Sequence, residues 1–174
     1  MAGECLAGLD RRWRQSQRAH AQSHRLGPLF TDAEQLKVLA VAALLHDIGY
    51  GSELVRTRFY AIDGALYVRE RGVDEQVMSL MAHHSCAAVE ADVRGLGAEM
   101  FGFPHHPEPL LVDAMIWCDM TSGPTGEDVG IDWRLEDISR RYPPDTLVAW
   151  TVEIPEPLLL AGWIRVEVHL GRPL

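Results

Sequence analysis

Residues 35–48 constrain the fold more than any other part of the chain, because they are apolar on nearly every side of a helix. Leucine, valine and alanine make up most of this stretch, and Gly49 follows it. A helix that is apolar all round has to be covered by other elements, so we predict a buried central helix. Thr31 and Glu34 have the spacing of a capping box before it, and Gly49 is a natural stop after it.

Helical periodicity also predicts most of the remaining chain to be helical. We expect His105 and His106 to be exposed in a loop over 95–109, and Asp132 to cap a short helix. The C-terminal segment fits a strand or a helix, and we favour a helix because a lone strand would have no partner. The sequence therefore predicts an all-α bundle, with helices over residues 4–26, 35–48, 58–71, 74–91, 110–120 and 132–141.

Composition narrows the class of protein. The chain has 174 residues, of which 47% are hydrophobic, and this is enough for a single domain over 1–174. The net charge of −9 argues against non-specific nucleic-acid binding, which depends on neutralising phosphates. No apolar run approaches the roughly 18 residues of a membrane span. Three scattered cysteines suit a reducing compartment, so we expect a cytoplasmic protein.

The pair His46-Asp47 ends the predicted buried helix and is the first candidate site. An ionised carboxylate in an apolar environment is unfavourable unless it is paired or bound to a metal. Imidazole together with carboxylate suits zinc, manganese, iron or nickel rather than calcium. The alternative is that His46 is a hydrogen-bonded core histidine and that Asp47 caps the next turn.

A second pair, His83-His84, lies within the predicted helix 74–91, and Asp119 ends the apolar run 114–118. Adjacent side chains of a helix point about 100° apart, so at least one of the two histidines should face a polar site or solvent. Asp119 could equally belong to the turn after its helix. Each feature is weak alone, but their order along the chain is far more specific: His-Asp, then His-His, then Asp.

This order resembles the HD-domain family of metal-dependent phosphohydrolases. The matching motifs are L-L-H-D-I-G with His46 and Asp47, L-M-A-H-H-S with His83 and His84, and I-W-C-D-M-T with Asp119. The stretch 62–65, I-D-G-A, is similar to the family's segment between the two histidine pairs. The resemblance covers residues from about 10 to 142 and leaves 143–174 as a C-terminal helical extension.

The resemblance implies a helical bundle and a phosphohydrolase that uses a metal-activated water. It implies that His46, Asp47 and Asp119 bind a divalent metal ion, which could be Mn, Fe, Ni, Zn or Mg. It also implies that His83 and His84 are catalytic residues that bind a second metal or contact the phosphate. The expected substrate is a nucleotide or another small phosphate ester, and a homo-oligomer is compatible with this interpretation.

The sequence departs from the family pattern at three positions. Gln15 stands where the family's first histidine ligand is expected, Tyr60 where many relatives have a histidine, and Tyr50 where they often have a lysine. An arginine such as Arg56 or Arg58, or one near the N-terminus, is then the candidate for binding phosphate. The departures leave an alternative function open, namely a catalytically silent HD-like module that binds a nucleotide or a protein.

Overall fold

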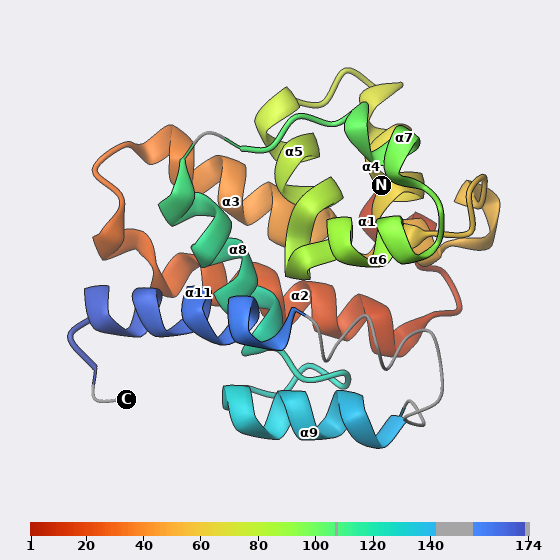
Figure 1. Cartoon of the computed structure of the whole chain (residues 1–174). Coiled ribbons are helices and arrows are strands. Elements are labelled where there is room, and N and C mark those ends of the chain that lie inside the picture. The colour runs from red at the N-terminus through yellow and green to blue at the C-terminus, as the bar shows by residue number, and fades with distance from the viewer. Residues whose placement is uncertain (107, 142–154, 173–174) are drawn as a thin grey trace.

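The structure, a computed structural model, describes residues 1–106, 108–141 and 155–172, and within these ranges it consists of helices joined by turns and loops (Figure 1). None of the helices in these ranges is long and apolar enough to cross a membrane. The predicted all-α fold is confirmed for the described residues. In chain order the helices are α1 (Ala2–Cys5), α2 (Asp10–Arg25), η1 (Gly27–Leu29), α3 (Ala33–Leu45), η2 (Ile48–Tyr50), η3 (Ser52–Leu54), α4 (Tyr60–Arg69), α5 (Glu75–His83), η4 (His84–Cys86), α6 (Ala87–Val93), α7 (Gly97–Phe101), α8 (Pro109–Met120), α9 (Ile131–Arg141) and α11 (Glu156–His169).

Helix α3 is the buried central helix that the sequence predicts. It contacts α2, α5 and α8, and most of its residues from Val38 onward are buried. It ends at Leu45 rather than Ile48, because the chain tightens there into the short 3₁₀ helix η2. The side chains of residues 46 and 47 therefore leave the end of the helix instead of lying along its side.

The starts of several helices differ from the prediction. Asp32, not Thr31, is the N-cap of α3, and its carboxylate accepts the backbone N–H of Glu34 at 2.9 Å. Helix α9 begins at Ile131, so the predicted cap Asp132 lies inside its first turn. The predicted helix over 4–26 is two helices, α1 and α2, and Gly8, with a φ of +80°, lies between them.

The predicted continuous helix over 74–91 is wrong in its middle. Helix α5 ends at His83, and Ser85 and Cys86 adopt φ values of 49° and 59°, which separate α5 from α6. Side chains other than glycine rarely adopt this left-handed region, and such residues often mark functional sites. Here the break turns His84 and Ser85 inward, and the Ser85 hydroxyl donates a hydrogen bond to Asp119.

The predicted loop over 95–109 contains a short helix, α7, and only one of its two histidines is exposed. His105 is exposed as expected, whereas His106 is 7% exposed and the prediction for it is wrong. The backbone N–H of Glu108 donates to Nδ1 of His106, and Nε2 of His106 lies 3.3 Å from the side-chain oxygen of Gln76. These contacts hold the His106 ring against the start of α5.

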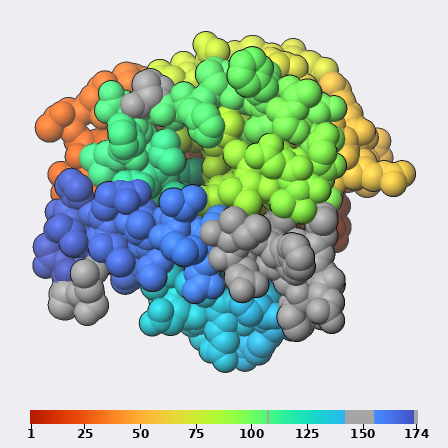
Figure 2. Space-filling view, in the orientation of Figure 1, coloured from red at the N-terminus to blue at the C-terminus, as the bar shows by residue number. Residues whose placement is uncertain are grey.

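The C-terminal helix α11 lies between α8 and α9 on one face of the molecule (Figure 2). The prediction of a helix is confirmed here, while residues 143–154 of the predicted extension lie outside the described ranges. A buried hydrogen bond of 2.6 Å, from Trp117 Nε1 to Glu167, joins α8 to α11. Ion pairing between Asp113 and Arg165 adds a second link, with both contacts at 2.6 Å.

Replacing Glu167 with alanine should lower the free energy of unfolding by about 1–3 kcal/mol, because it leaves the indole N–H of Trp117 buried without an acceptor. Urea unfolding followed by tryptophan fluorescence measures the change. Glu136→Ala, at an exposed position of α9, is the control and should stay within about 0.5 kcal/mol of the wild type. Equal stability of the two variants would mean that this bond does not stabilise the packing of α11.

Candidate active site

The end of α3 places His46 in the centre of the site. Its Nδ1 lies 2.8 Å from the carbonyl oxygen of Ala43. Because a carbonyl only accepts, Nδ1 is the nitrogen that donates, and Nε2 is the ring nitrogen left to face a ligand. This Nε2 atom is buried and has no hydrogen-bond partner among the described residues. An orphaned buried nitrogen is unfavourable and calls for a ligand.

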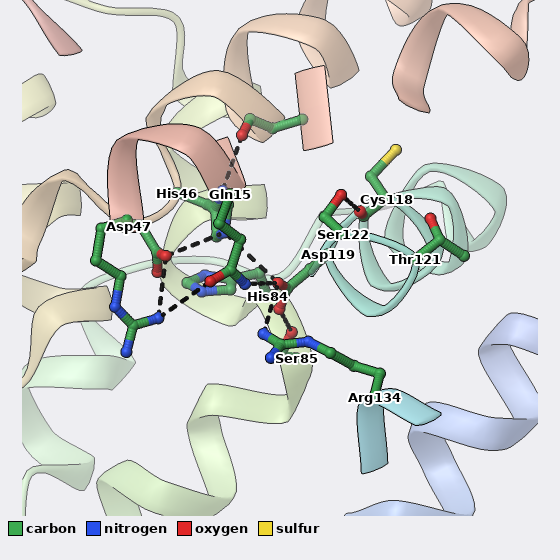
Figure 3. Close-up of polar contacts among 12 residues, drawn as sticks. Gln15, His46, Asp47, His84, Ser85, Cys118, Asp119, Thr121, Ser122 and Arg134 are labelled. Atoms are coloured by element: carbon green, nitrogen blue, oxygen red, sulfur yellow. Dashed lines mark hydrogen bonds and ion pairs between the residues drawn. The ribbon is translucent and has the colours of Figure 1, made fainter. Parts of the chain in front are cut away.

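Two buried carboxylates flank this nitrogen (Figure 3). Oδ2 of Asp47 and Oδ1 of Asp119 each lie 3.6 Å from His46 Nε2. Asp47 is 2% exposed and Asp119 is 7% exposed, so little solvent screens them. The 3.6 Å separations are too long for hydrogen bonds and suit donor atoms that share a metal ion.

His84 completes the group. Its Nδ1 donates to the carbonyl oxygen of Met81 at 2.5 Å, which leaves Nε2 as the free ring nitrogen, and its ring centroid lies 5.0 Å from that of His46. Ligand atoms of His46, His84 and Asp119 all lie within 4.8 Å of one another. The structure thus brings together four of the five residues predicted for the site, and we call His46, Asp47, His84 and Asp119 the His/Asp group.

His83 is the predicted site residue that the structure does not bring to this group. Its Nε2 donates to the carbonyl oxygen of Phe103 at 2.7 Å, and its ring stacks on His105 with centroids 3.8 Å apart. The side chain therefore faces the loop that follows α7. The two neighbouring histidines face different surroundings because α5 ends at His83 and the chain leaves the helix at His84.

The electrostatics of the His/Asp group favour a positive charge at its centre. Burial lowers the pKa of His46, but the carboxylates of Asp47 and Asp119 outweigh it and raise the pKa to about 9. Burial raises the pKa of Asp119, but His46 and Arg134 outweigh it and hold that pKa well below its ordinary value. A divalent cation bound between the carboxylates would also supply the positive charge that these carboxylates favour.

The three departures from the expected pattern line the same cavity beside this group. Gln15 is 2% exposed, and its Nε2 donates to Oδ1 of Asp119 at 2.9 Å, so position 15 does face the site as predicted. Tyr50 and Tyr60 stack on each other with ring centroids 4.3 Å apart. Two positions where imidazole and ammonium groups were expected therefore form one aromatic pair.

The cavity has a volume of about 390 Å³, and five arginines of the described residues line it. Arg12, one of the N-terminal arginines, lines the cavity and approaches Asp47 to 3.2 Å. Arg58 also lines the cavity, whereas Arg56 is bound to Glu70 at 2.5 and 2.7 Å and does not line it. The remaining arginines of the wall are Arg94, Arg134 and Arg141.

Sequence reasoning missed two residues of the site. Ser85 was not predicted as a site residue, because a continuous helix was expected over residues 74–91. Arg134 gave no signal, because one arginine among many in a polar helix is usually solvated, and yet it is only 4% exposed and lies 3.7 Å from Asp119. Only its position relative to Ile138 and Arg141, on one side of a helix, would have hinted at a shared surface.

Comparison with known families agrees with this geometry. The family model of the HD domain matches residues 13–120, which is more than half of the chain. The chain belongs to the HD-domain family. The predicted family is thereby confirmed, and HD domains are part of a superfamily of metal-dependent phosphohydrolases. The HD match ends at residue 120, before α9 and α11 begin. Searches of curated proteins and of solved structures found no match.

Proposed function

We propose that this HD-domain chain hydrolyses a small phosphate ester with the help of a divalent metal ion held by the His/Asp group. The observation that carries the proposal is the buried Nε2 of His46. It has no hydrogen-bond partner among the described residues and lies 3.6 Å from the carboxylates of Asp47 and Asp119. Nitrogen and carboxylate donors of this kind suit Mn, Fe, Ni or Zn.

A metal ion bound there would polarise a phosphoryl oxygen and lower the pKa of a water molecule, which supplies the nucleophile. The chain itself holds the ligands in place. The carbonyls of Ala43 and Met81 fix the protonated Nδ1 atoms of the two histidines and leave both Nε2 atoms free. Gln15 and Ser85 each donate to one oxygen of Asp119. Outer contacts of this kind orient metal ligands and tune their affinity.

Arg58 of the cavity wall would bind phosphate oxygens of the substrate. Arg58 lines the cavity and is exposed. Its φ of 65° is a left-handed backbone conformation that residues other than glycine rarely adopt. A guanidinium group matches the geometry of a phosphate with two parallel hydrogen bonds. A cavity of about 390 Å³ is at the small end of ligand sites, which favours a nucleotide or a smaller phosphorylated metabolite.

We expect one metal ion rather than two. Tyr60 occupies the position at which many relatives have a further histidine, and its ring is 5.4 Å from that of His84. Because this ring also stacks on Tyr50, it presents an aromatic surface where a second ion would need a nitrogen donor.

Elemental analysis of the untagged protein, expressed with Mn, Fe, Ni and Zn available, tests the proposal. We expect about one transition-metal ion per chain, because the donor set is that of a single site. The loaded protein should release phosphate from a panel of nucleotides and phosphorylated metabolites, and removal of the metal with a chelator should stop the release. A protein that takes up no metal after reconstitution would contradict the proposal.

The alternative is a catalytically silent binding module, and one arrangement favours it. Arg12 faces Asp47 at 3.2 Å, and Gln15 donates to Asp119. Side chains of the protein therefore offset part of the negative charge of both carboxylates without a metal ion. In that case a nucleotide should raise the melting temperature without any metal, and no phosphate should be released. The two functions therefore give opposite results in the same pair of measurements.

Gln15→His should strengthen metal binding. Position 15 already reaches Asp119, at 2.9 Å from the amide nitrogen, so an imidazole there would add a donor beside the group. We expect the affinity for Zn or Mn to rise by about tenfold or more, since even outer contacts change metal affinity by 10- to 100-fold. Competition with a chromophoric chelator measures it. An unchanged or weaker affinity would show that position 15 cannot supply a ligand.

A further inference from the structure

Helix α9 lies outside the part of the chain that matches the HD family, yet it forms one wall of the cavity. The family match covers residues 13–120, and α9 covers Ile131–Arg141. Three residues of α9, Arg134, Ile138 and Arg141, line the cavity. They are spaced i, i+4 and i+7 and therefore share one side of the helix. The family motifs account for the His/Asp group but not for this wall.

A small apolar cluster holds α9 in this position. Ile131 of α9 is buried with Ile116 and Met120 of α8 and with Leu159 of α11. Ile138 packs against the same cluster. Because α8 also carries Asp119 near its end, this cluster fixes α9 relative to the His/Asp group. Arg134 is thus placed by packing rather than by the ion pairs it makes.

The guanidinium of Arg134 is buried, but it has few close acceptors for its hydrogen-bond donors. The residue is 4% exposed, and its Nε atom has no hydrogen-bond partner among the described residues. Its two ion-pair contacts are long, 3.7 Å to Asp119 and 3.5 Å to Asp137. Asp119 already accepts closer hydrogen bonds from Gln15 and Ser85 on its two oxygens. Donors buried in this state are unfavourable unless a further acceptor arrives.

We propose that Arg134 is a substrate-binding residue that donates hydrogen bonds to an anionic oxygen of the phosphate beside the His/Asp group. The inference deepens the proposed function, because it assigns a phosphate-binding residue to a helix that the HD match does not include. Arg134 fits this role because it combines a buried position, an Nε donor without a partner among the described residues and a place in the cavity wall next to Asp119. A guanidinium fork suits phosphate oxygens, whereas a lysine would offer only a point charge.

Inorganic phosphate is the probe for this proposal, and isothermal titration calorimetry gives its affinity with the metal bound and with a chelator present. Arg134→Gln should weaken phosphate binding by about tenfold or more in both conditions, because it removes charge-assisted hydrogen bonds. Arg134→Lys should bind with intermediate affinity, since it keeps the charge and loses the fork. Arg140→Gln, at an exposed position of the same helix, is the matched control and should bind like the wild type.

The outcomes separate this inference from the proposed function. If Arg134→Gln has wild-type circular dichroism and melting temperature and binds phosphate as tightly as the wild type, the role of Arg134 is wrong even in an active, metal-loaded enzyme. The same holds if the wild type binds no phosphate. If the wild type holds no metal but loses phosphate affinity on Arg134→Gln, the inference stands and the metal-dependent function fails. If Arg134→Gln does not fold, the test rests on Arg134→Lys. A phosphate affinity equal to that of the wild type in Arg134→Lys then overturns the proposal.

Discussion

Replacing Asp119 with asparagine should empty the metal site while the fold persists. The two side chains have the same shape, and the amide oxygen can still accept the hydrogen bond from Gln15. The change removes one of the two negative charges that flank His46 Nε2, and a neutral amide is a weak ligand for a transition metal. We expect metal affinity to fall by more than about 100-fold, beyond the range for outer-shell partners, and phosphate release to fall with it.

Asp113→Asn is the matched control for this variant. Asp113 is a buried carboxylate on the same helix, but it pairs with Arg165 at 2.6 Å and does not line the cavity. Elemental analysis of both purified variants should find the metal of the wild type in Asp113→Asn and almost none in Asp119→Asn. Full metal content in Asp119→Asn would show that Asp119 is not a ligand.

Gly49→Ala should prevent stable folding. A Cβ atom at Gly49 would lie 1.9 Å from the carbonyl oxygen of Tyr60 and 2.6 Å from the backbone nitrogen of Gly64. Both are backbone atoms of α4, so no side chain can rotate away to make room. Overpacking typically lowers stability by about 1–3 kcal/mol even where side chains can move, and we expect a loss above that range.

Denaturant unfolding of Gly49→Ala, or its recovery as insoluble protein, measures this effect. Gly130→Ala is the control, because a Cβ atom there meets nothing within 4 Å. That variant should keep the wild-type free energy of unfolding to within about 0.5 kcal/mol. A Gly49→Ala protein as stable as the control would mean that η2 and α4 do not approach as closely as the structure has them.

This close approach gives a physical reason for two of the sequence motifs. Gly49 ends L-L-H-D-I-G, and Gly64 lies in I-D-G-A, and the two glycines meet where η2 crosses α4. The contact brings α4 against the turn that carries Asp47. In the same segment, Asp63 is buried and accepts hydrogen bonds of 2.8 Å from the backbone and the hydroxyl of Thr57. The two glycines thus let η2 and α4 approach closely, and the hydrogen bonds between Asp63 and Thr57 fix the turn before α4.

Local patterns were enough to predict much of the fold and much of the site. The apolar content of α3 requires burial, and the periodicity of residues 110–120 leads to α8 with an error of one residue. The order of His46, Asp47, His84 and Asp119 also pointed to residues that do meet in space. The predictions of α3 and α8 rest on properties that neighbouring residues express by themselves, such as helical spacing and the need to cover an apolar surface. The grouping of the four site residues rests on the resemblance to the HD-domain family.

The sequence by itself therefore determined the all-α class, the central helix and most of the His/Asp group. The tertiary structure decided what depends on contacts between distant segments. Asp119 reaches across to Ser85 only because the chain breaks after His83, and the same break leaves His83 facing the loop after α7. Arg134 acquires its buried place beside Asp119 because α9 packs on α8 and α11. No local pattern encodes such distances, since they follow from how the helices pack once the apolar surfaces are covered.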